Sequence, residues 1–484
     1  MVAVAGLRRL ASLLDGTVVL PGDDAYAAAR PVRTRSVRET LPCAVVRCVT
    51  PADVSRAVSF VREHDLPFAV RGRGHSLADR STTFGVLIDL GAMASIRVSS
   101  GLVTVGPGVQ IGALADRLAA DGLLVPCGWC PTVGVTGAAL GGGFGTFGRR
   151  YGLACDHLVA ADVVLADGRL VHAPPDLLWA LRGAGGGQFG IVTSLTLRPR
   201  PAPPSTMFAL MWRYDHAAVV VDAWQRWAPS APDTVNAELV LVMGPDPVTI
   251  PLVVVFGVVV GGDAGPVLDR FARDTGTPPW RRFVTPLSGP DAARHHHYAG
   301  AAANTGPVTG VPQGTRPGRR VLRSHFVDRP LPADAVDRLV ESVVTDRVPG
   351  QYREVELVPW GGAYSRVPVA DAAFAHRDPL FLVEHNADVP ATADDAAREA
   401  VARWVTRSWS TIRPWESGAV YPNYPDPDLP DWLRAYHGPN LERLVDVKTT
   451  HDPDNVFHHP QSVTPTPLAA DTTGPTGMLP ATAE

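Results

Sequence analysis

Two segments of the sequence each carry a potential nucleophile among closely spaced glycines. Residues 71–76 read RGRGHS and present His75, and residues 127–145 read CGWCPTVGVTGAALGGGFG and present Cys127 and Cys130. A neutral imidazole and a thiolate are side chains that form covalent bonds with an electrophilic partner. Glycine lets bare N–H groups approach a ligand closely. Both segments are therefore candidates for holding a cofactor.

Glycine-rich loops recur through the first 200 residues, at 71–76, 106–108, 134–148 and 183–190. A single loop of this kind is more often a tight turn, but four loops together suit a diphosphate and a flat ring system. Gly143, Gly145 and Gly148 also form a GxGxxG pattern. A Rossmann site needs a strand before this pattern and a βαβ unit around it, and a Thr-Gly-rich segment precedes it here. The sequence does not favour a nicotinamide site.

The spacing of Cys127 and Cys130 leaves two other interpretations open. A redox CxxC motif requires a helix N-terminus in a thioredoxin-like setting, which the surrounding sequence does not indicate. A zinc site could use the same pair with Cys155 and His157, but the gap of one residue between the latter two is tight. The sequence therefore predicts no metal site, and Cys127 is interpreted as a packing residue.

The elements around these motifs indicate an α+β fold. Thr50, Pro51 and Asp53 predict the capped start of a helix. Strand-like runs at 68–70 and 86–90 flank the RGRGHS loop, and a helix from Ile111 is expected to end at Gly122. Further on, 163–165 and 170–171 flank Asp167-Gly168, which predicts a hairpin.

The pattern changes after residues 198–204, RPRPAPP, which predict a domain boundary. Beyond it, apolar strands at 207–212, 237–243 and 252–260 alternate with helices at 217–227 and 332–345. This predicts a sheet that helices cover on one face. Residues 276–318 are expected to form long loops, with His295, His296 and His297 solvated, and a helix is expected at 439–448. The chain from 464 is expected to be disordered.

The bulk composition limits the class of protein. A chain of 484 residues is long enough for two domains. Its net charge of −4 argues against nucleic acid as a partner, which leaves small molecules. The longest apolar run, 252–260, is far too short to span a bilayer. Residues 1–14 indicate an amphipathic helix and not a signal peptide, so a cytoplasmic protein without a membrane partner is expected; the oligomeric state is left open.

Taken together, the motifs resemble those of berberine bridge enzyme-like flavoproteins in the vanillyl-alcohol oxidase superfamily. The matching segments follow one another along nearly the whole chain: 71–76, 128–137, 140–145, 150–156, 178–183, 189–193, 421–424, 447–457 and 461–463. The resemblance implies a two-domain FAD-binding fold whose substrate domain is an antiparallel sheet covered by helices. The implied domains are an FAD-binding part at 1–205, a substrate domain at 206–424, an FAD-binding return at 425–463, and a tail at 464–484.

The resemblance also implies how FAD is held. His75 would bond to the flavin 8α-methyl group and Cys130 to ring carbon six, a double tether that in this family raises the reduction potential. The other residues implied to bind the cofactor are Arg71, Gly72, Arg73, Gly74, Ser76, Thr132, Val133, Gly134, Gly137, Gly141, Gly142, Gly145, Gly190, Val192 and Asn423. The chain departs from the family pattern at Gln188 and His157, and neither is an attachment residue.

Two residues match family positions for the catalytic base that takes the substrate proton while hydride moves to N5. They are Tyr421, the first residue of a Tyr-x-Asn-Tyr motif, and Glu384, in Phe-Leu-Val-Glu-His. Plant relatives place a lysine where this chain has Leu382, so the activation of a tyrosine with an ordinary pKa near 10 stays open. Trp360, Tyr364, His385 and Tyr424 are candidate pocket walls.

The residue three positions after the attachment cysteine controls access of O2 in this family, and Val133 implies an open route. The resemblance thus implies an oxidase that acts on a hydroxyl (or amine) group of a secondary metabolite or sugar and releases H2O2. A flavin-dependent cyclase or dehydrogenase, a cyclisation catalyst without net redox change, and a flavin protein that only sequesters a ligand are the alternatives.

Overall fold

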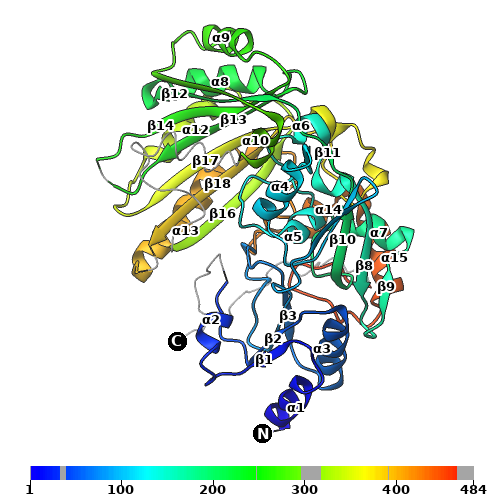
Figure 1. Cartoon of the computed structure of the whole chain (residues 1–484). Coiled ribbons are helices and arrows are strands. Elements are labelled where there is room, and N and C mark those ends of the chain that lie inside the picture. Colours follow the sequence, from blue (N-terminus) through cyan, green and yellow to red (C-terminus); the bar gives the residue numbers. More distant parts are fainter. Residues whose placement is uncertain (1, 33–39, 247, 296–317, 391, 466–484) are drawn as a thin grey trace, which may run out of the picture.

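The computed structural model describes residues 2–32, 40–246, 248–295, 318–390 and 392–465. Two regions are visible in Figure 1: a large curved sheet with its helices, and a second region built from both ends of the chain. The second region contains the blue and cyan N-terminal elements together with the orange-red C-terminal helices α14 (Trp432–His437) and α15 (Leu441–His451). The chain therefore returns to its first region after completing the large sheet.

The first sheet of the N-terminal region has four strands and ends at the RGRGHS loop. Its spatial order is β1 (Thr17–Val19), β2 (Ala44–Arg47), β4 (Val86–Asp89), β3 (Phe68–Arg71). Strands β2, β4 and β3 are parallel, and β1 is antiparallel to β2. Around it lie the helices α1 (Val2–Ala11), α2 (Tyr26–Ala29) and α3 (Pro51–Glu63). The predicted cap of α3 is present, because the Asp53 N–H donates to Thr50 Oγ1 at 3.2 Å.

The second sheet of this region is antiparallel and has five strands. Its order is β5 (Ile96–Ser99), β6 (Leu102–Val105), β10 (Ile191–Leu197), β8 (Leu158–Val164), β9 (Leu170–His172). The helices beside it are α4 (Ile111–Ala119), α5 (Val135–Leu140) and α7 (Pro175–Leu181), whereas α6 (Gly148–Tyr151) lies next to β13 (Val235–Met243) of the large sheet. A two-stranded ribbon joins β7 (Leu123–Leu124) to β11 (Arg200–Pro201). The predicted hairpin at Asp167-Gly168 joins β8 to β9, and Gly168 takes a φ of +83°, which suits glycine.

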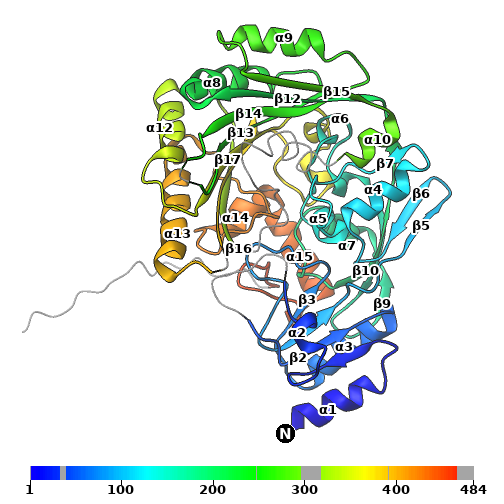
Figure 2. The ribbon, with the colours of Figure 1, turned by 60° about the vertical axis from the view of Figure 1, so that its left-hand side comes forward.

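The third sheet has seven antiparallel strands and accounts for the middle of the chain. Its order is β15 (Arg281–Leu287), β12 (Ser205–Arg213), β14 (Leu252–Val260), β13 (Val235–Met243), β17 (Tyr352–Pro359), β18 (Phe381–Pro390), β16 (Gly318–Val327). Helices α8 (Ala217–Trp227), α9 (Gly265–Asp274), α12 (Ala333–Val344) and α13 (Asp395–Ser410) lie along its outer side (Figure 2). The opposite face of the sheet is directed at the N-terminal region.

Side-chain alternation divides the strands of this sheet between two environments. Val355, Leu357 and Val383 belong to the large apolar core under the helices, together with Trp224 and Trp404. Because neighbouring residues on a strand point to opposite faces, the residues between them face the N-terminal region. The antiparallel sheet covered by helices and the α+β class were both predicted, and both are confirmed.

One stretch differs from the expectation. Residues 276–318 were predicted to be long loops, but they contain β15 and the helix α10 (Gly289–Arg294), whose Ser288 N-cap accepts from the Asp291 N–H. Pairing with β12 stabilises β15 although most of its side chains are exposed, so its sequence lacks strand alternation. His296, His297 and the tail beyond Pro465 lie outside the described residues. Among the described helices, none is both long and apolar enough to cross a membrane.

Candidate functional site

A cavity of about 1200 Å³ lies between the N-terminal region and the inner face of the seven-stranded sheet. Most of its lining comes from β3 and the loop after it, the segment 128–144, residues 186–192, strands β16 to β18, and the return segments 421–425 and 457–460. Most of the residues singled out from the sequence line this cavity: Gly72, Arg73, Gly74, His75, Ser76, Cys130, Thr132, Val133, Gly134, Gly137, Gly190, Val192, Glu384, Tyr421 and Asn423.

The two potential nucleophiles meet at one hydroxyl group. Thr132 Oγ1 lies 3.2 Å from His75 Nε2 and 3.5 Å from Cys130 Sγ. His75 follows strand β3 and Cys130 precedes helix α5, so segments far apart in sequence bring these side chains to one part of the wall. A hydroxyl both donates and accepts, so Thr132 can orient the imidazole and the thiol at the same time.

The glycines beside Arg73 serve two different purposes. Gly74 has a φ of +72° and turns the chain where a side chain would be strained. A Cβ at Gly72 would lie 2.9 Å from the carbonyl oxygen of Pro107, so Gly72 permits close packing of two loops. Arg73 itself packs against Gly134. The loop thereby reaches the cavity with His75 at its tip.

Four residues expected to contact the cofactor do not line the cavity. Arg71 lies behind its wall, where it pairs with Asp89 at 2.8 Å and donates to the carbonyl oxygens of residues 29–31. Gly141, Gly142 and Gly145 are packing positions: a Cβ there would meet the Asn423 side chain, the Phe374 ring and the Cys127 carbonyl oxygen, respectively. The sequence motif does not distinguish a glycine that faces the ligand from one that supports the wall.

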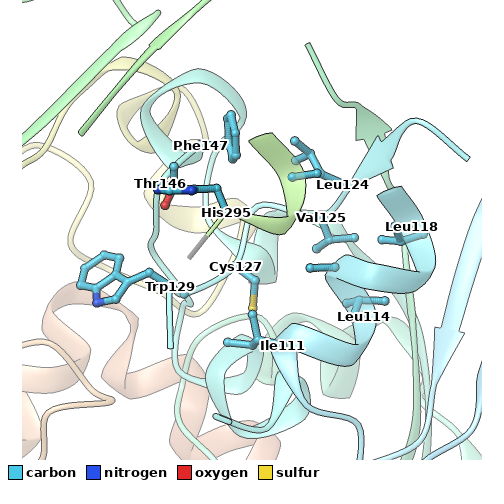
Figure 3. Close-up of a pocket in the computed structure, with 13 residues that line it drawn as sticks. Ile111, Leu114, Leu118, Leu124, Val125, Cys127, Trp129, Thr146, Phe147 and His295 are labelled. Atoms are coloured by element: carbon cyan, nitrogen blue, oxygen red, sulfur yellow. The ribbon is translucent and has the colours of Figure 1, made fainter. Parts of the chain in front are cut away.

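Cys127 and Cys130 line two different cavities. The Cys127 side chain enters a small pocket between α4 and the 123–129 segment, beside Ile111 and Leu114 (Figure 3). Burial raises the pKa of its thiol to about 12, so it remains protonated at neutral pH. The redox CxxC interpretation therefore has no support in the geometry, and Cys127 is a packing residue.

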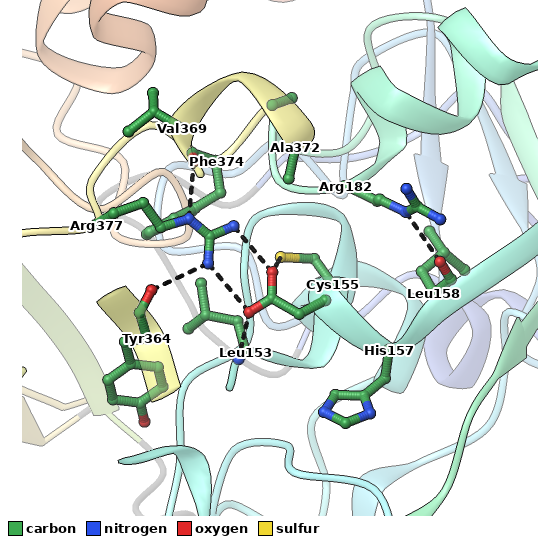
Figure 4. Close-up of polar contacts among 12 residues, drawn as sticks. Leu153, Cys155, His157, Leu158, Arg182, Tyr364, Val369, Ala372, Phe374 and Arg377 are labelled. Atoms are coloured by element: carbon green, nitrogen blue, oxygen red, sulfur yellow. Dashed lines mark hydrogen bonds and ion pairs between the residues drawn. The ribbon is translucent and has the colours of Figure 1, made fainter. Parts of the chain in front are cut away.

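The cysteine and histidine of the alternative zinc site are held apart from each other. Both ring nitrogens of His157 are engaged by backbone oxygens, those of Arg198 and Tyr151, at 2.9 Å. Cys155 is buried beside Asp156, on the other side of the turn from His157 (Figure 4). Within the described ranges, the His, Cys, Asp and Glu side chains that cluster closely enough for a metal are all glutamates on the large sheet.

Asp156 and Arg377 join the two regions of the molecule. The guanidinium donates to both carboxylate oxygens, at 2.9 and 3.0 Å, and also to the carbonyl oxygens of Phe374 and Tyr364 (Figure 4). Arg149 makes a second junction, since its guanidinium donates to four carbonyl oxygens, those of Pro229, Ala231, Val235 and Trp360. These contacts fix the sheet face relative to the loops that carry the nucleophiles.

Tyr421 lines the cavity with its hydroxyl already engaged. The oxygen accepts from the Gly143 N–H at 2.8 Å and from Asn423 Nδ2 at 3.1 Å. Burial raises the pKa of the phenol above its ordinary value, although these two donors oppose the shift. Asn423 also donates to the Ala138 carbonyl oxygen, so it connects the return segment with α5. Tyr421 is therefore a wall residue held by two donors, and its burial keeps the phenol protonated at neutral pH.

Glu384 lines the cavity from strand β18, and its carboxyl group has a pKa near neutral pH. Burial and the nearby charge of Glu354 raise its pKa to about 7, against the opposing effects of Arg320 and a hydrogen bond from Tyr424. A general base works best when its pKa lies near the working pH. Glu384 is therefore the better placed of the two candidate bases.

The other predicted pocket walls divide between two places. Tyr424 lines the cavity beside Glu384, whereas Trp360 and Tyr364 stack on each other in the aromatic cluster behind it. His385 points to the opposite face of the sheet, where it contacts Ser408 Oγ at 2.9 Å and His325. Sequence reasoning missed Glu356, which lines the cavity next to Glu384. The spacing of Tyr352, Glu354 and Glu356 on one strand was the available signal.

The cavity fits FAD in size and in chemistry. Its volume exceeds the several hundred cubic ångströms typical of a drug-sized ligand, which leaves space for a dinucleotide and a substrate. Three lining side chains, Ser81, Thr136 and His459, each bury a polar atom that has no hydrogen-bond partner among the described residues. A ligand with many polar groups would satisfy them. His75 and Cys130, the two nucleophiles available for a tether, also line this cavity.

Buried polar contacts hold the C-terminal return segment, whose residues 457–460 line the cavity. Lys448 Nζ donates to Asp452 and to the carbonyl oxygens of Gln188 and Phe457, at 2.6 to 2.7 Å. Gln188 Oε1 in turn accepts from the Val463 N–H. Gln188, one of the two departures from the family pattern, thus ties the return segment to the 183–190 loop.

Comparisons with known proteins agree with this architecture. The FAD binding domain family matches residues 42–174, and the family described as berberine and berberine like matches residues 420–464. The uncharacterized FAD-linked oxidoreductase YgaK of Bacillus subtilis is 31% identical over 463 residues, which cover 93% of this chain and 97% of that protein. Chitooligosaccharide oxidase of Gibberella zeae is 28% identical, with 88% and 87% covered.

A solved structure shows the same fold over almost the whole chain. The BBE-like 1 protein of Physcomitrella patens superposes with a TM-score of 0.79 at 26% identity, covering 94% of this chain and 98% of that one. Fold, cavity and sequence relatives therefore agree, and the chain belongs to the berberine bridge enzyme-like FAD-linked oxidoreductases of the vanillyl-alcohol oxidase superfamily.

Proposed function

We propose that this chain is an oxidase with FAD attached to both His75 and Cys130, and that it oxidises a hydroxyl group of a small molecule such as a secondary metabolite or sugar. The observation that carries the proposal is the convergence of these two nucleophiles on the hydroxyl of Thr132 at the cavity wall. When bound between these residues, FAD would supply the hydride acceptor, and O2 would be the final oxidant that yields H2O2.

In this proposal the chain's own residues position the substrate and move one proton. Glu384 takes the proton from the substrate hydroxyl, because its pKa of about 7 leaves a substantial carboxylate fraction at neutral pH. The Tyr424 hydroxyl, which hydrogen-bonds Glu384, orients the carboxylate toward the cavity. Tyr421 and Asn423 hold the return segment against α5 and do not exchange the proton.

Val133 supports the oxidase assignment over the alternatives that do not use O2. It lines the cavity one residue after Thr132 and packs against the apolar core beneath α5. Its short branched side chain leaves more space at this wall than a leucine would. We therefore expect Val133→Leu to slow reoxidation by O2 while the reductive half-reaction is retained.

The mass of the denatured chain tests the proposal directly. Purified protein is expected to carry one FAD that survives acid precipitation, and the His75→Ala and Cys130→Ala variants are each expected to keep one bond. The double variant should release all its flavin. H2O2 formed in stoichiometric amount with an oxidised product, in a screen of alcohols, amines and sugars, would support the oxidase. A chain without attached flavin would contradict the double tether, and product without H2O2 would favour a dehydrogenase or cyclase.

A further inference from the structure

The inner face of the large sheet gathers carboxyl groups beside the cavity. Glu238 on β13, Glu354 and Glu356 on β17, and Glu384 on β18 all lie on this face, and each is at most 5% exposed. Carboxylate oxygens of Glu354, Glu356 and Glu384 lie within 4.8 Å of one another. We call these four residues the carboxyl cluster. Buried carboxyl groups this close repel one another when ionised, which is costly without a compensating positive charge.

Hydrogen-bond acceptors exceed donors on this face. Glu356 Oε1 and Glu238 Oε2 are buried without a hydrogen-bond partner among the described residues. The same holds for Ser324 Oγ and Asn386 Oδ1, which are not carboxylates and are 2% and 0% exposed. In the sheet register Ser324 lies opposite Glu384, and Asn386 lies opposite Glu354, so both side chains share the face of the cluster. A proton shared between Glu238 and Glu356 joins these two carboxyl groups by a hydrogen bond, so a ligand that displaces this proton must supply donors in its place.

The positive charge of Arg320 lowers the pKa of Glu384, but one guanidinium does not offset the charge of four carboxyl groups. Arg320 on β16 is held by Asp388 through two contacts of 2.9 and 3.1 Å. The remaining titratable neighbours are phenols: Tyr352, whose hydroxyl donates to Glu354, and Tyr424, which bonds Glu384. Burial and the neighbouring carboxyl groups raise the pKa of Glu238 to about 8 and raise that of Glu356 well above its ordinary value. Without a ligand, Glu238 and Glu356 therefore retain protons at neutral pH.

We propose that the substrate of this site is an organic cation, an alcohol that carries a protonated amine, with its ammonium group bound at Glu356, which lines the cavity, and stabilised by the neighbouring charge of Glu354. This inference rests on the proposed function, in which the hydroxyl group of the substrate is oxidised. That hydroxyl group would lie at Glu384, one strand nearer the 421–425 segment. An ammonium has three donors and no acceptor, which complements the orphaned oxygens. Trp129, Phe144 and Leu322 in the cavity wall supply apolar surface for the rest of the molecule.

A matched pair of probes tests this inference without knowledge of the substrate. 2-Phenylethylammonium is charged and 2-phenylethanol is neutral at about pH 8, where an alkyl ammonium stays protonated. Binding to the holoenzyme is followed by the flavin absorption spectrum and, independently, by tryptophan fluorescence. We expect the ammonium to bind at least about tenfold more tightly than the alcohol, equivalent to about 1.4 kcal/mol. We also expect it to release protons when it binds at about pH 7, because a bound cation favours the ionised carboxylates.

Variants separate the cluster from general electrostatics. Glu354→Gln and Glu356→Gln should each reduce the preference for the ammonium about tenfold, whereas Glu399→Gln, on the exposed face of α13, should leave it unchanged. Equal binding of the two probes, or an ammonium preference that survives both cluster variants, would overturn the inference. Tight binding of Ca²⁺ or Mn²⁺ that excludes the ammonium would also overturn it and identify an inorganic cation site.

The proton-release measurement uses the wild-type chain, so it decides the matter even if the cluster variants fail to fold. Flavin attachment is scored separately from the mass of the denatured chain. A chain that prefers the ammonium but carries no attached flavin would contradict the proposed function alone. A chain with doubly attached flavin that binds both probes equally would contradict the substrate class alone.

Discussion

Removal of the charge of Asp156 should show how strongly the molecule depends on its junction between regions. Asp156 lies in the turn at 154–157 of the N-terminal region. Arg377 lies between the short helical turn at 369–371 and strand β18 of the large sheet. Their side chains are 7% and 1% exposed. In Asp156→Asn the guanidinium keeps neutral oxygen partners, including the carbonyl oxygens of Phe374 and Tyr364, but loses its counter-charge. The substitution therefore isolates the electrostatic part of the contact.

The burial of the pair sets the expected size of the effect. Breaking a buried ion pair by removing one partner costs about 3–5 kcal/mol, because an uncompensated charge stays in the interior. The retained amide oxygen places Asp156→Asn at the lower end, about 3 kcal/mol, or more than a hundredfold in the unfolding equilibrium. The exposed pair Arg117–Asp121, at 41% and 43% exposure, is the matched control. Asp121→Asn should cost less than about 0.5 kcal/mol.

Urea unfolding of the holoenzyme, followed by flavin and tryptophan fluorescence, measures both effects. In Arg377→Met combined with Asp156→Asn, the loss should be smaller than the sum of the single losses, because the unpaired charge is gone. The interpretation fails if Asp156→Asn is no more destabilising than Asp121→Asn. It also fails if the two substitutions at the junction are additive, since additivity would mean that they do not interact.

Three further outcomes follow from the site and its surroundings. Glu384→Gln should slow flavin reduction by about 10²–10⁴-fold. In the wild type, the rate of flavin reduction should fall tenfold per pH unit below about pH 7, and this pH dependence should be absent in the variant. An unchanged pH dependence in stopped-flow data would exclude Glu384 as the base. Burial lowers the pKa of His376 to about 4, so between about pH 6.5 and 4 the unfolded chain binds this proton and the folded chain does not. The contribution of His376 to the free energy of unfolding is therefore complete above about pH 6.5 and falls by about 2 kcal/mol on going to pH 5. Urea midpoints measured against pH should show this loss, and it should be smaller in His376→Gln. Thr132→Val should leave part of the chain with incompletely attached flavin in the denatured mass spectrum, while uniform double attachment would show that its hydroxyl is dispensable.

The sequence predicted the parts of the site that depend on local chemistry. The capping residues of α3, the glycine turn between β8 and β9, and the apolar runs of β12, β13 and β14 each fix their own conformation, so their elements were found with small errors at the ends. The segments that carry His75 and Cys130 were found for the same reason: a reactive side chain among glycines is visible in a few residues.

The errors concern properties that only the assembled chain determines. Arg71 belongs to the RGRGHS motif, yet it is the last residue of β3 and faces Asp89 on the neighbouring strand. His385 follows Glu384 directly, and strand alternation therefore puts it among the helices. Strand β15 was missed because pairing with β12, and not an apolar pattern of its own, makes it a strand.

The same alternation that builds the core of the large sheet also builds its chemical face. On β17 and β18 the residues that pack under the helices include Val355, Leu357 and Val383, and three members of the carboxyl cluster, Glu354, Glu356 and Glu384, alternate with them along the strands. A shift of register by one residue would place apolar side chains in the cavity and carboxyl groups under the helices. Burial of the apolar face therefore fixes which side chains reach the cavity. Because the junction at Asp156 and Arg377 holds that face toward His75 and Cys130, the fold couples the position of the carboxyl cluster to that of the two nucleophiles.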